Sequence, residues 1–434
     1  MHEQVSRIAI LGFGREGQSL LRFIKKNPDY RGREIWILDK DTSVKNRLEA
    51  RQLKNVHWQV GSGYLKNLSR FDLILRSPGI PYTLPQLYRA RCDGTKVSSA
   101  TNLFFHEIRK LPGNQRPAII GVTGTKGKGT TSTLIYQMLR SANRRTILAG
   151  NIGKPMLEIL PEAKRTDFVV LELSSFQLQD FPYAPDIAVV LDIFPDHLDQ
   201  HKTLREYYGS KANIGRFQKK SDAIFFFSNN PLSKKIAAKS PARKFPVKPK
   251  TESLRKNYEM ATSVAKFLNI PESTLEKIVK SFRGLEHRME KVRTKGNITF
   301  WNDSAATNPE ATAAAIRTIK SPLVLIAGGK DKNLNYRPLA DAILESLHVK
   351  SVILIGENRK KIEKELKADN KKLSIVLASD LEEAVNVARR TAESLVISNK
   401  SSVAVLFSPG AASFDMFKSY ADRGEQFKKI VRKL

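Results

Sequence analysis

The stretch AIIGVTGTKGKGTT, at residues 118–131, decides the fold. Residues 118–122 form an apolar run that predicts a buried strand, and the pattern through Leu134 and Met138 predicts a helix after a glycine-rich turn. Backbone N–H groups in such a turn bind anions, the helix N-terminus adds its dipole, and a lysine supplies a full positive charge. The stretch therefore predicts a loop that binds ATP phosphates. The alternative is a glycine-rich turn without a chemical role.

One position of this loop departs from the usual pattern. The residue after the loop lysine is normally Ser or Thr, whose hydroxyl binds magnesium, but here Gly129 follows Lys128. Thr130 is the next hydroxyl along the chain and becomes the candidate magnesium ligand. The residues that the loop predicts for ATP binding are Gly124, Thr125, Lys126, Gly127, Lys128, Gly129, Thr130 and Thr131.

Two further predicted strands end in polar clusters. Residues 168–173 run into the cluster ELSSFQ at 172–177, and residues 187–191 run into DIFPDHLD at 192–199. The carboxyl ends of parallel strands lie together at one edge of a sheet, which here is the edge with the phosphate loop. Carboxylates at that edge hold magnesium against phosphate oxygens. The clusters therefore predict a magnesium site, with surface or capping acids as the alternative.

The N-terminal residues carry a second glycine motif. A predicted strand at residues 7–12 leads into GFGREG at 12–17 and a helical pattern, and a second strand at 34–38 ends at Asp39. This spacing is typical of a Rossmann-type nucleotide fingerprint, in which glycines admit a diphosphate and an acid binds a ribose or a base edge. A third run, 71–75, leads into the turn SPGI at 77–80. A tight turn with an incidental acid is the alternative.

The C-terminal residues alternate strands and helices. Three of the predicted strand ends are polar, which indicates either a binding edge or a set of helix caps. These ends are NDSAATNP at 302–309, GGKDK at 328–332 and SPGAASFD at 408–415. The predicted strands are residues 298–301, 323–327, 351–355, 373–376 and 403–407.

These patterns predict an α/β protein of three domains. The expected domains are a Rossmann-like domain at residues 1–97, a central parallel sheet with the phosphate loop at 98–284, and a Rossmann-like domain at 285–434. The N-terminal residues resemble neither a signal peptide nor a membrane-length apolar run, so we expect a cytoplasmic protein. The single cysteine, Cys92, excludes an intrachain disulfide and a thiolate metal cluster within one chain.

The charge balance is unusual. The chain has 74 Lys and Arg against 43 Asp and Glu, a formal net charge of +31. Such a charge would suit a nucleic-acid binder, but the lysines are spread along the chain and lack interleaved aromatic residues for base stacking. We interpret the excess as a solvated surface and expect no specific nucleic acid partner.

Taken in order, the motifs resemble those of the Mur ligases over nearly the whole chain, and most closely the branch that adds D-glutamate to UDP-N-acetylmuramoyl-L-alanine in peptidoglycan precursor synthesis. The residues that carry the resemblance are the phosphate loop, ELSSFQL at 172–178, DHLD at 196–199, Tyr207 to Lys211, GLEHRME at 284–290, NDSAATN at 302–308, SPGAASFD at 408–415, Arg423, Gly424 and Phe427.

The resemblance implies roles for individual residues. Lys128, His197 and Lys211 would be catalytic, with two magnesium ions held by Thr130, Glu172, His197 and a carbamylated Lys211. ATP would also contact Asn257, Arg288 and Asp303. The UDP substrate would bind Gly14, Arg15, Glu16, Asp39, Lys40, Gly79 and Asn151, and D-glutamate would bind Thr307, Lys332, Ser413 and Tyr420. An acyl phosphate would form first, and the amine of D-glutamate would then displace phosphate. The resemblance further implies a monomer without membrane insertion.

Four positions depart from the pattern of this branch, and alternatives stay open. Gly129, Ala305, Met260 and Tyr420 stand where the branch usually has Ser or Thr, lysine, asparagine and phenylalanine. Folylpolyglutamate synthetases share the Gly-Lys-Gly loop and the reaction type, but do not need the domain at residues 1–97. The other Mur ligases add L-alanine, a diamino acid or a dipeptide. An inactive relative that binds nucleotide or RNA is the remaining alternative.

Overall fold

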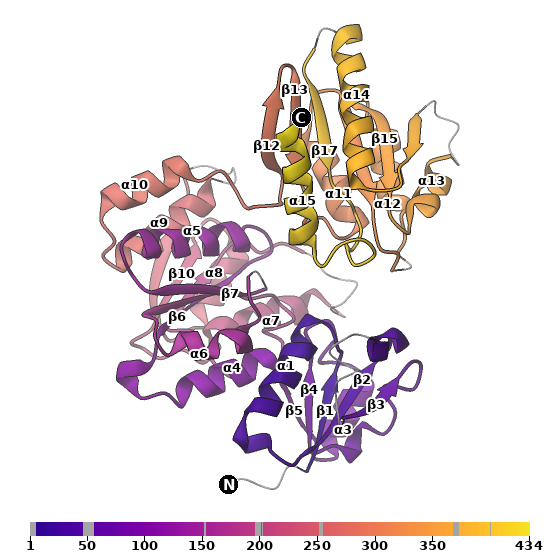
Figure 1. Ribbon diagram of the computed structural model, residues 1–434. Coiled ribbons are helices and arrows are strands. Elements are labelled where there is room, and N and C mark those ends of the chain that lie inside the picture. The colour runs from indigo at the N-terminus through magenta and orange to yellow at the C-terminus, as the bar shows by residue number, and fades with distance from the viewer. Residues whose placement is uncertain are drawn as a thin grey trace. The chain divides into compact units, whose positions relative to one another are not determined.

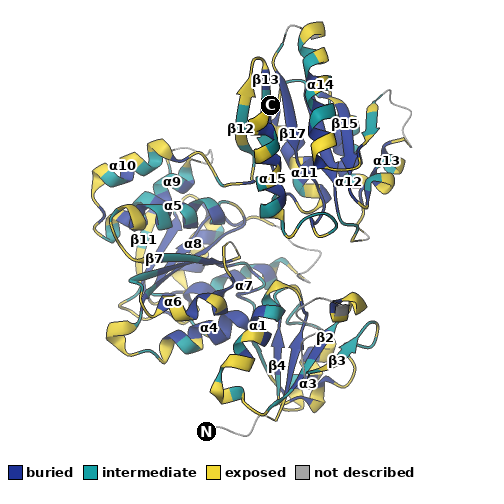
Figure 2. Cartoon of the chain, in the orientation of Figure 1, coloured by how far each residue is buried: buried dark blue, intermediate teal, exposed yellow. Residues whose placement is uncertain are grey.

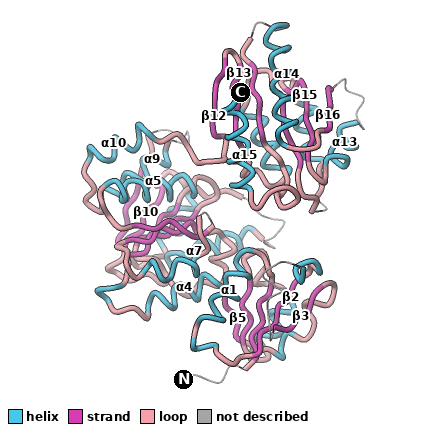
Figure 3. The backbone as a smooth tube through the Cα atoms, in the orientation of Figure 1, coloured by secondary structure: helices cyan, strands magenta, loops and turns pink. Residues whose placement is uncertain are grey.

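The computed structural model describes residues 6–46, 56–151, 153–195, 201, 203–250, 255–332, 334–367, 373–399 and 401–434. The chain divides into two compact units, Met1–Phe282 and Arg283–Leu434. The first unit contains two sheets and the second unit contains one, so the chain has three α/β domains, as predicted (Figure 1). Figure 3 shows helices flanking the strands of each sheet. Among these residues, no helix has the length and apolar character that crossing a bilayer requires.

The N-terminal sheet has the strand order of half a Rossmann fold, β3-β2-β1-β4-β5, with every neighbouring pair parallel. Its strands are β1 (Arg7–Leu11), β2 (Glu34–Asp39), β3 (Val56–Val60), β4 (Leu73–Arg76) and β5 (Lys96–Ser99). Its helices are α1 (Arg15–Lys26), α3 (Pro85–Cys92) and α4 (Ala100–Arg109). The boundary expected after residue 97 falls inside β5, so the domain limits remain a prediction.

Helix α1 lies on this sheet through one apolar face. Its buried residues include Gly17, Leu20, Leu21 and Ile24, which recur at the spacing of a helix face. A Cβ at Gly17 would overlap the carbonyl oxygen of Gly12. Glycine is therefore needed at position 17 for the helix to follow the turn this closely.

The central sheet is entirely parallel, in the order β11-β10-β9-β6-β8-β7. Its strands are β6 (Ala118–Thr123), β7 (Thr146–Gly150), β8 (Phe168–Glu172), β9 (Ile187–Val190), β10 (Ala223–Phe227) and β11 (Arg243–Val247). Its helices are α5 (Lys128–Ser141), α6 (Leu160–Ala163), α7 (Leu204–Arg216), α8 (Pro231–Ala238), α9 (Lys256–Phe267) and α10 (Glu272–Ser281). The chain order reverses around β6, so its carboxyl end is a ligand-binding position.

The C-terminal sheet is mixed, in the order β12-β13-β17-β14-β15-β16. Its edge strand β12 runs antiparallel to β13, whereas the other described pairs are parallel. Its strands are β12 (Glu290–Lys295), β13 (Ile298–Asn302), β14 (Leu323–Gly328), β15 (Val349–Ile355), β16 (Ser374–Leu377) and β17 (Val403–Phe407). Its helices are α11 (Pro309–Thr318), α12 (Arg337–Glu345), α13 (Arg359–Lys367), α14 (Leu381–Asn399) and α15 (Tyr420–Lys433).

The cores follow from the strand composition. Strands β9, β10, β14 and β17 are buried along their whole length, as runs of apolar residues in parallel sheets usually are. Figure 2 shows the exposed residues mainly on the helices and the connections. Short 3-10 turns lie at Pro28–Tyr30, Thr42–Asn46, Leu68–Arg70, Gly113–Gln115 and Met156–Ile159.

Candidate active site

The phosphate loop lies where the sequence predicts it, between the carboxyl end of β6 and the start of α5. Gly127 has a left-handed φ of 83°, and a Cβ at Gly124 would lie 2.7 Å from the Cβ of Leu191. The side chain of Lys128 folds back over the loop, and its Nζ donates to the carbonyl oxygens of Gly124 and Thr125 at 3.1 and 3.0 Å. The loop is therefore a tight turn with a lysine amine at its centre, as anion binding requires.

Helix α7 brings Lys211 to the same loop. The Lys211 side chain is 1% exposed, and its Nζ donates a 2.8 Å hydrogen bond to the Gly124 carbonyl oxygen. That Nζ also lies 4.8 Å from the ring centre of Tyr207, whose hydroxyl is 2.9 Å from Oγ1 of Thr125. Residues that are 82 and 87 positions from their partners in the loop are thus fixed against it by direct contacts.

The acidic end of β8 lies next to β6. Glu172 is buried, and its Oε1 accepts a 2.9 Å hydrogen bond from the amide of Asn151. The backbone N–H of Asn151 donates to the carbonyl oxygen of Glu172 at 3.0 Å. Glu172, a candidate metal ligand, is thus bonded to Asn151, a candidate contact of the UDP substrate. The hydrogen bond from the amide fixes the direction of the Glu172 carboxylate.

The donor set near the loop fits magnesium. Thr130 lies in the first turn of α5, and the hydroxyl of Thr131 is buried with no hydrogen-bond partner among the described residues. Magnesium prefers carboxylate and hydroxyl oxygens, and Glu172 and Thr130 supply both kinds. His197 and the rest of the cluster at 196–199 lie outside the described residues.

Helix α9 also reaches the loop. A Cβ at Gly127 would overlap the side-chain oxygen of Asn257, so the asparagine packs directly on the glycine. Its neighbour Lys256 forms an ion pair of 2.5 Å with the buried carboxylate of Asp192. Asp192, which follows β9, is therefore neutralised by a lysine from α9.

The glycine turn of the N-terminal domain is held by the acid at the end of β2. Oδ2 of Asp39 accepts from the N–H of Phe13 at 2.5 Å, and Oδ1 accepts from the N–H of Asp41 at 2.8 Å. Lys40 is exposed beside it. A Cβ would meet open space at both Gly14 and Gly79. Three of the predicted UDP-binding residues in this domain, Gly14, Lys40 and Gly79, are therefore accessible.

Two residues of this turn contact the central domain. The Arg15 guanidinium donates to the carbonyl oxygen of Gly153, and Oε1 of Glu16 accepts from the amide of Gln177 at 3.0 Å. Burial raises the pKa of Glu16, and the hydrogen bond from Gln177 acts in the opposite direction. Oε1 of Gln177 in turn accepts from the N–H of Ser174 at 2.9 Å. The turn is thus connected to the segment that follows Glu172.

A buried ion pair joins the same two domains, and the sequence did not indicate it. Arg76 at the end of β4 lies 2.6 Å from the carboxylate of Asp180, with side-chain exposures of 0% and 4%. The guanidinium also donates to the carbonyl oxygens of Phe176 and Ile80 at 2.9 and 2.8 Å. Arg76 is a charged residue at the end of an apolar strand, and this is the one local sequence feature that singles it out.

In the second unit, Asp303 lies at the carboxyl end of β13. Its carboxylate accepts from the Ser408 hydroxyl at 2.7 Å and from the N–H of Met289 at 3.1 Å. Burial raises the pKa of Asp303 to about 6. The exposed Arg288 lies between His287 and Met289, which both have left-handed φ angles, 61° and 45°. The structure thus brings the two predicted ATP contacts of this unit into adjoining segments.

The candidate amino-acid residues differ in exposure. Ser413 is 2% exposed and Tyr420 is 36% exposed, while Thr307 and Lys332 are exposed. The cap of α15 is Ser419, whose hydroxyl accepts from the N–H of Asp422, so Ser413 is not a cap of that helix.

Arg423, on α15, ties together the loops that carry Thr307 and Ser413. Its guanidinium is fully buried and donates to the carbonyl oxygens of Ser304 and Ala411 at 2.9 and 3.0 Å. Burial lowers its pKa to about 10. The sequence motif includes Arg423, but the motif does not predict that this side chain contacts two separate loops.

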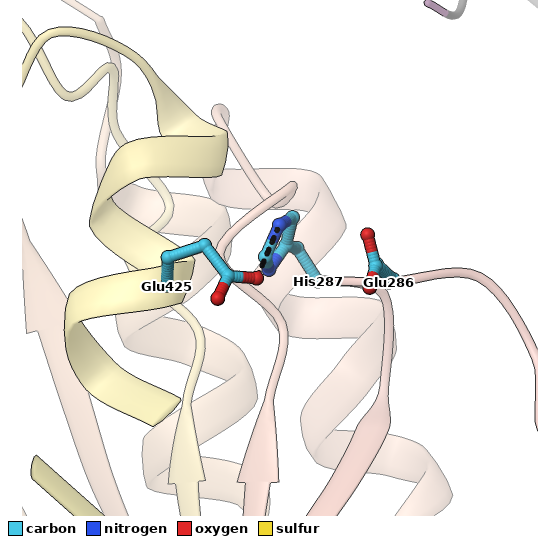
Figure 4. Close-up of side chains that lie close together, drawn as sticks. All are labelled: Glu286, His287 and Glu425. Atoms are coloured by element: carbon cyan, nitrogen blue, oxygen red, sulfur yellow. Dashed lines mark ion pairs between the residues drawn. The ribbon is translucent and has the colours of Figure 1, made fainter. Parts of the chain in front are cut away.

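A second group of acids lies beside His287, which is drawn with Glu286 and Glu425 in Figure 4. The ammonium group of Lys428 lies 2.8 Å from Glu425, 3.1 Å from Glu290 and 3.6 Å from Glu286. Because the lysine ammonium already contacts these three carboxylates and would repel a metal ion, we do not assign a metal ion to this group.

A cavity of about 680 Å³ opens at the opposite edge of the central sheet from the phosphate loop. Arg109, Phe217 and Phe267 line it, and each lies at the C-terminal end of a helix. Cations are favoured at helix C-termini without any ligand. Arg109 therefore needs no ligand at this position, and Arg116 already pairs with Asp186 at 2.5 Å, so we do not assign an anion site to this cavity.

Comparison with known proteins agrees with the geometry. The Mur ligase MurD-like N-terminal domain matches residues 6–99, the Mur ligase middle domain matches 122–293, and the Mur ligase glutamate ligase domain matches 287–400. The UDP-N-acetylmuramoylalanine–D-glutamate ligase of Acetivibrio thermocellus is 36% identical, over 99% of this chain and 96% of that protein. Its counterpart from Clostridium tetani is 32% identical over 99% and 97%.

Solved structures share the fold. UDP-N-acetylmuramate-alanine ligase MurC from Thermotoga maritima matches with a TM-score of 0.52 at 17% identity, over 98% of this chain and 99% of that one. A folylpolyglutamate synthase from Mycobacterium tuberculosis matches with a TM-score of 0.56 at 13% identity, over 76% and 95%. The family matches and the full-length identity lead to one conclusion: the chain belongs to the Mur ligase family.

Proposed function

We propose that the protein is an ATP-dependent ligase that adds D-glutamate to UDP-N-acetylmuramoyl-L-alanine, a step of peptidoglycan precursor synthesis. The observation that carries this proposal is the MurD-like N-terminal domain at residues 6–99, joined to the middle and glutamate ligase domains. The curated relatives named for this reaction match along 99% of the chain. A folate-type ligase would not need this N-terminal domain.

The phosphate loop would bind the ATP phosphates. Its backbone N–H groups would contact phosphate oxygens, while Lys128 would exchange its contacts with the Gly124 and Thr125 carbonyl oxygens for the γ-phosphate. Asn257 packs on Gly127 and would hold the nucleotide from the α9 side. In the second unit, Arg288 and Asp303 would contact ATP.

Two magnesium ions would be held by Thr130, Glu172, His197 and Lys211. When bound, they would offset the negative charge of the phosphates and of the reacting carboxylate. Lys211 would serve as its carbamate, which would supply a carboxylate ligand for magnesium and would retain an N–H for the hydrogen bond to the Gly124 carbonyl oxygen.

The UDP end of the substrate would bind along the N-terminal turn. Arg15 and Glu16 already contact the central domain, so a substrate seated on this turn would extend toward Asn151 and Glu172. Gly14, Asp39, Lys40 and Gly79 would complete this end of the site. D-glutamate would bind Thr307, Lys332, Ser413 and Tyr420 in the second unit.

The chemistry follows from the weakness of a carboxylate as an electrophile. A carboxylate oxygen of the alanyl residue attacks the γ-phosphorus of ATP, the bond to the bridging oxygen breaks, and ADP leaves. The acyl phosphate then accepts the amine of D-glutamate at its carbonyl carbon. The tetrahedral intermediate loses a proton from nitrogen and expels phosphate, which leaves the amide. Lys128 would stabilise the charge that develops on the transferring phosphoryl group.

We also propose that the protein acts in the cytoplasm as a monomer, without a specific nucleic acid partner, and that residues 1–97, 98–284 and 285–434 are its three domains.

The test of the function is phosphate release from ATP with magnesium, with each substrate omitted in turn. Release should require both D-glutamate and UDP-N-acetylmuramoyl-L-alanine. Release that depends instead on a folate and L-glutamate would contradict the proposal.

A further inference from the structure

His201 is a buried histidine that the proposed mechanism does not use. It is 1% exposed and lies three residues before the start of α7, between the segment that follows β8 and the first turn of the helix. A buried imidazole is costly unless its polar atoms have partners. The groups that contact His201 therefore indicate which segments the buried ring holds together.

One side of the ring contacts the segment after Glu172. Nε2 of His201 lies 3.0 Å from the hydroxyl of Ser175, which is itself buried. The imidazole also stacks on the ring of Phe176, with centroids 5.0 Å apart and planes 8° from parallel. Ser175 is three residues beyond Glu172, so the ring is fixed to the backbone that carries the candidate metal ligand.

The other side contacts helix α7. Nδ1 lies 3.6 Å from a carboxylate oxygen of Glu206, and the ring meets Tyr207 edge-on with centroids 5.3 Å apart. Tyr207 contacts Thr125 in the phosphate loop, and Lys211 lies one helical turn further along. The ring is thus fixed to the helix that carries the second candidate ligand.

The Glu206 carboxylate extends this contact set. Its Oε1 also accepts from the amide of Gln179 at 2.8 Å, and Gln179 belongs to the same segment after β8. The 3.6 Å separation between Nδ1 and Glu206 is longer than a hydrogen bond, and the Ser175 contact fits either tautomer of the ring. One histidine therefore joins a strand end and a helix through two polar contacts and two ring contacts.

We propose that His201 is a positioning residue that sets the separation between Glu172 and Lys211, and so tunes the affinity of the magnesium site. The inference rests on the proposed function for its magnesium ligands. Supporting groups behind metal ligands change metal affinity by about 10- to 100-fold when they are replaced. A displacement of about 1 Å at such a site is enough to lower the rate strongly.

Three substitutions separate the contacts. His201→Phe keeps a ring to stack on Phe176 but removes the hydrogen bond to Ser175. His201→Gln places an amide near the position of Nε2 but removes the stack. Ser175→Ala removes the same hydrogen bond from the other side. His106→Gln, at an exposed position on α4, is the matched control.

The measurement is Mn²⁺ binding to the full-length protein with the ATP analogue β,γ-imido-ATP, followed by electron paramagnetic resonance. His201→Phe and Ser175→Ala should each weaken Mn²⁺ binding by about tenfold, and His201→Gln should weaken it less. The double variant with His201→Phe and Ser175→Ala should bind Mn²⁺ only slightly more weakly than either single variant, because both substitutions remove the same hydrogen bond. His106→Gln should match the wild type.

A structural role alone would lower the melting temperature and leave Mn²⁺ binding unchanged, and that result would overturn the proposal. If His201→Phe does not fold, Ser175→Ala and His201→Gln still decide the outcome. The titration needs no amino acid substrate. Wild-type protein that binds Mn²⁺ normally but shows no D-glutamate-dependent turnover would count against the proposed function and not against this role of His201.

Discussion

The Nζ atom of Lys211 donates a 2.8 Å hydrogen bond to the carbonyl oxygen of Gly124, which places a buried lysine of α7 on the phosphate loop. Lys128 donates to the same carbonyl oxygen at 3.1 Å. Two amines therefore converge on one backbone oxygen. A carbamate at Lys211 would leave one ammonium group at this oxygen and would add a carboxylate that can bind a metal.

The first prediction concerns this carbamate. With ¹³C-labelled bicarbonate, the wild-type protein should show a carbamate carbon signal by NMR, and Lys211→Arg should not, because a guanidinium does not form the adduct. The substitution should also lower the rate of phosphate release by about 100-fold or more. Lys235→Arg, on the exposed face of α8, should keep both the signal and the rate. An identical signal in Lys211→Arg would refute the assignment.

The second prediction concerns Gly127. Its left-handed backbone and its contact with Asn257 leave no room for a side chain. Gly127→Ala should raise the KM for ATP by at least about tenfold, since even the backbone strain alone costs about 1–3 kcal/mol. Gly113→Ala is the control, because its Cβ would meet no atom within 4 Å. Equal ATP kinetics for both variants would count against this picture of the loop.

The third prediction concerns the ion pair between Arg76 and Asp180. Both side chains are buried, so Arg76→Ala leaves a carboxylate without its main partner. We expect a loss of about 3–5 kcal/mol in the free energy of unfolding, measured by urea denaturation of the full-length chain. Arg89→Ala, at an exposed position of α3, should change it by less than about 0.5 kcal/mol. Similar losses for the two variants would show that the pair does not stabilise the protein.

The fourth prediction concerns the pH dependence of stability. Burial raises the pKa of Asp303 from 3.8 to about 6, so the folded protein binds this proton more tightly than the unfolded chain does. The contribution to stability is complete below about pH 4 and is lost as the pH rises through about 6.

Two pKa units at 1.36 kcal/mol each amount to about 3 kcal/mol. Asp303→Asn removes the titration, so the free energy of unfolding of the variant should fall less between pH 4 and pH 7 than that of the wild type. The measurement is urea denaturation at several pH values. Parallel pH curves for the two proteins would contradict the assignment of this shift to Asp303.

Local motifs were predictable from the sequence because their chemistry lies within a few residues. The phosphate loop at Gly124–Thr131 and the glycine turn before α1 both follow a strand and precede a helix, as their spacing indicates. Strand β10 was missed, although its sequence AIFFF is a plain apolar run. The edge strand β12, EKVRTK, alternates too many charges to be recognised by pattern alone.

Contacts between distant segments could not be predicted in the same way. Arg76 and Asp180 are 104 positions apart, and His201 meets Ser175 only because the segment before α7 lies beside the segment that follows β8. Such pairs depend on how the elements pack, which local sequence does not encode. His197 lies outside the described residues, so its predicted role in the metal site remains a prediction.

The central claim is tested most directly by identifying the product. The protein is incubated with ATP, magnesium, UDP-N-acetylmuramoyl-L-alanine and either D-glutamate or L-glutamate, and the product is measured by mass spectrometry. We predict a product heavier by one glutamyl residue with D-glutamate only, formed in a one-to-one ratio with phosphate. Folded protein that forms no such product with D-glutamate, or forms it equally with L-glutamate, would contradict the claim.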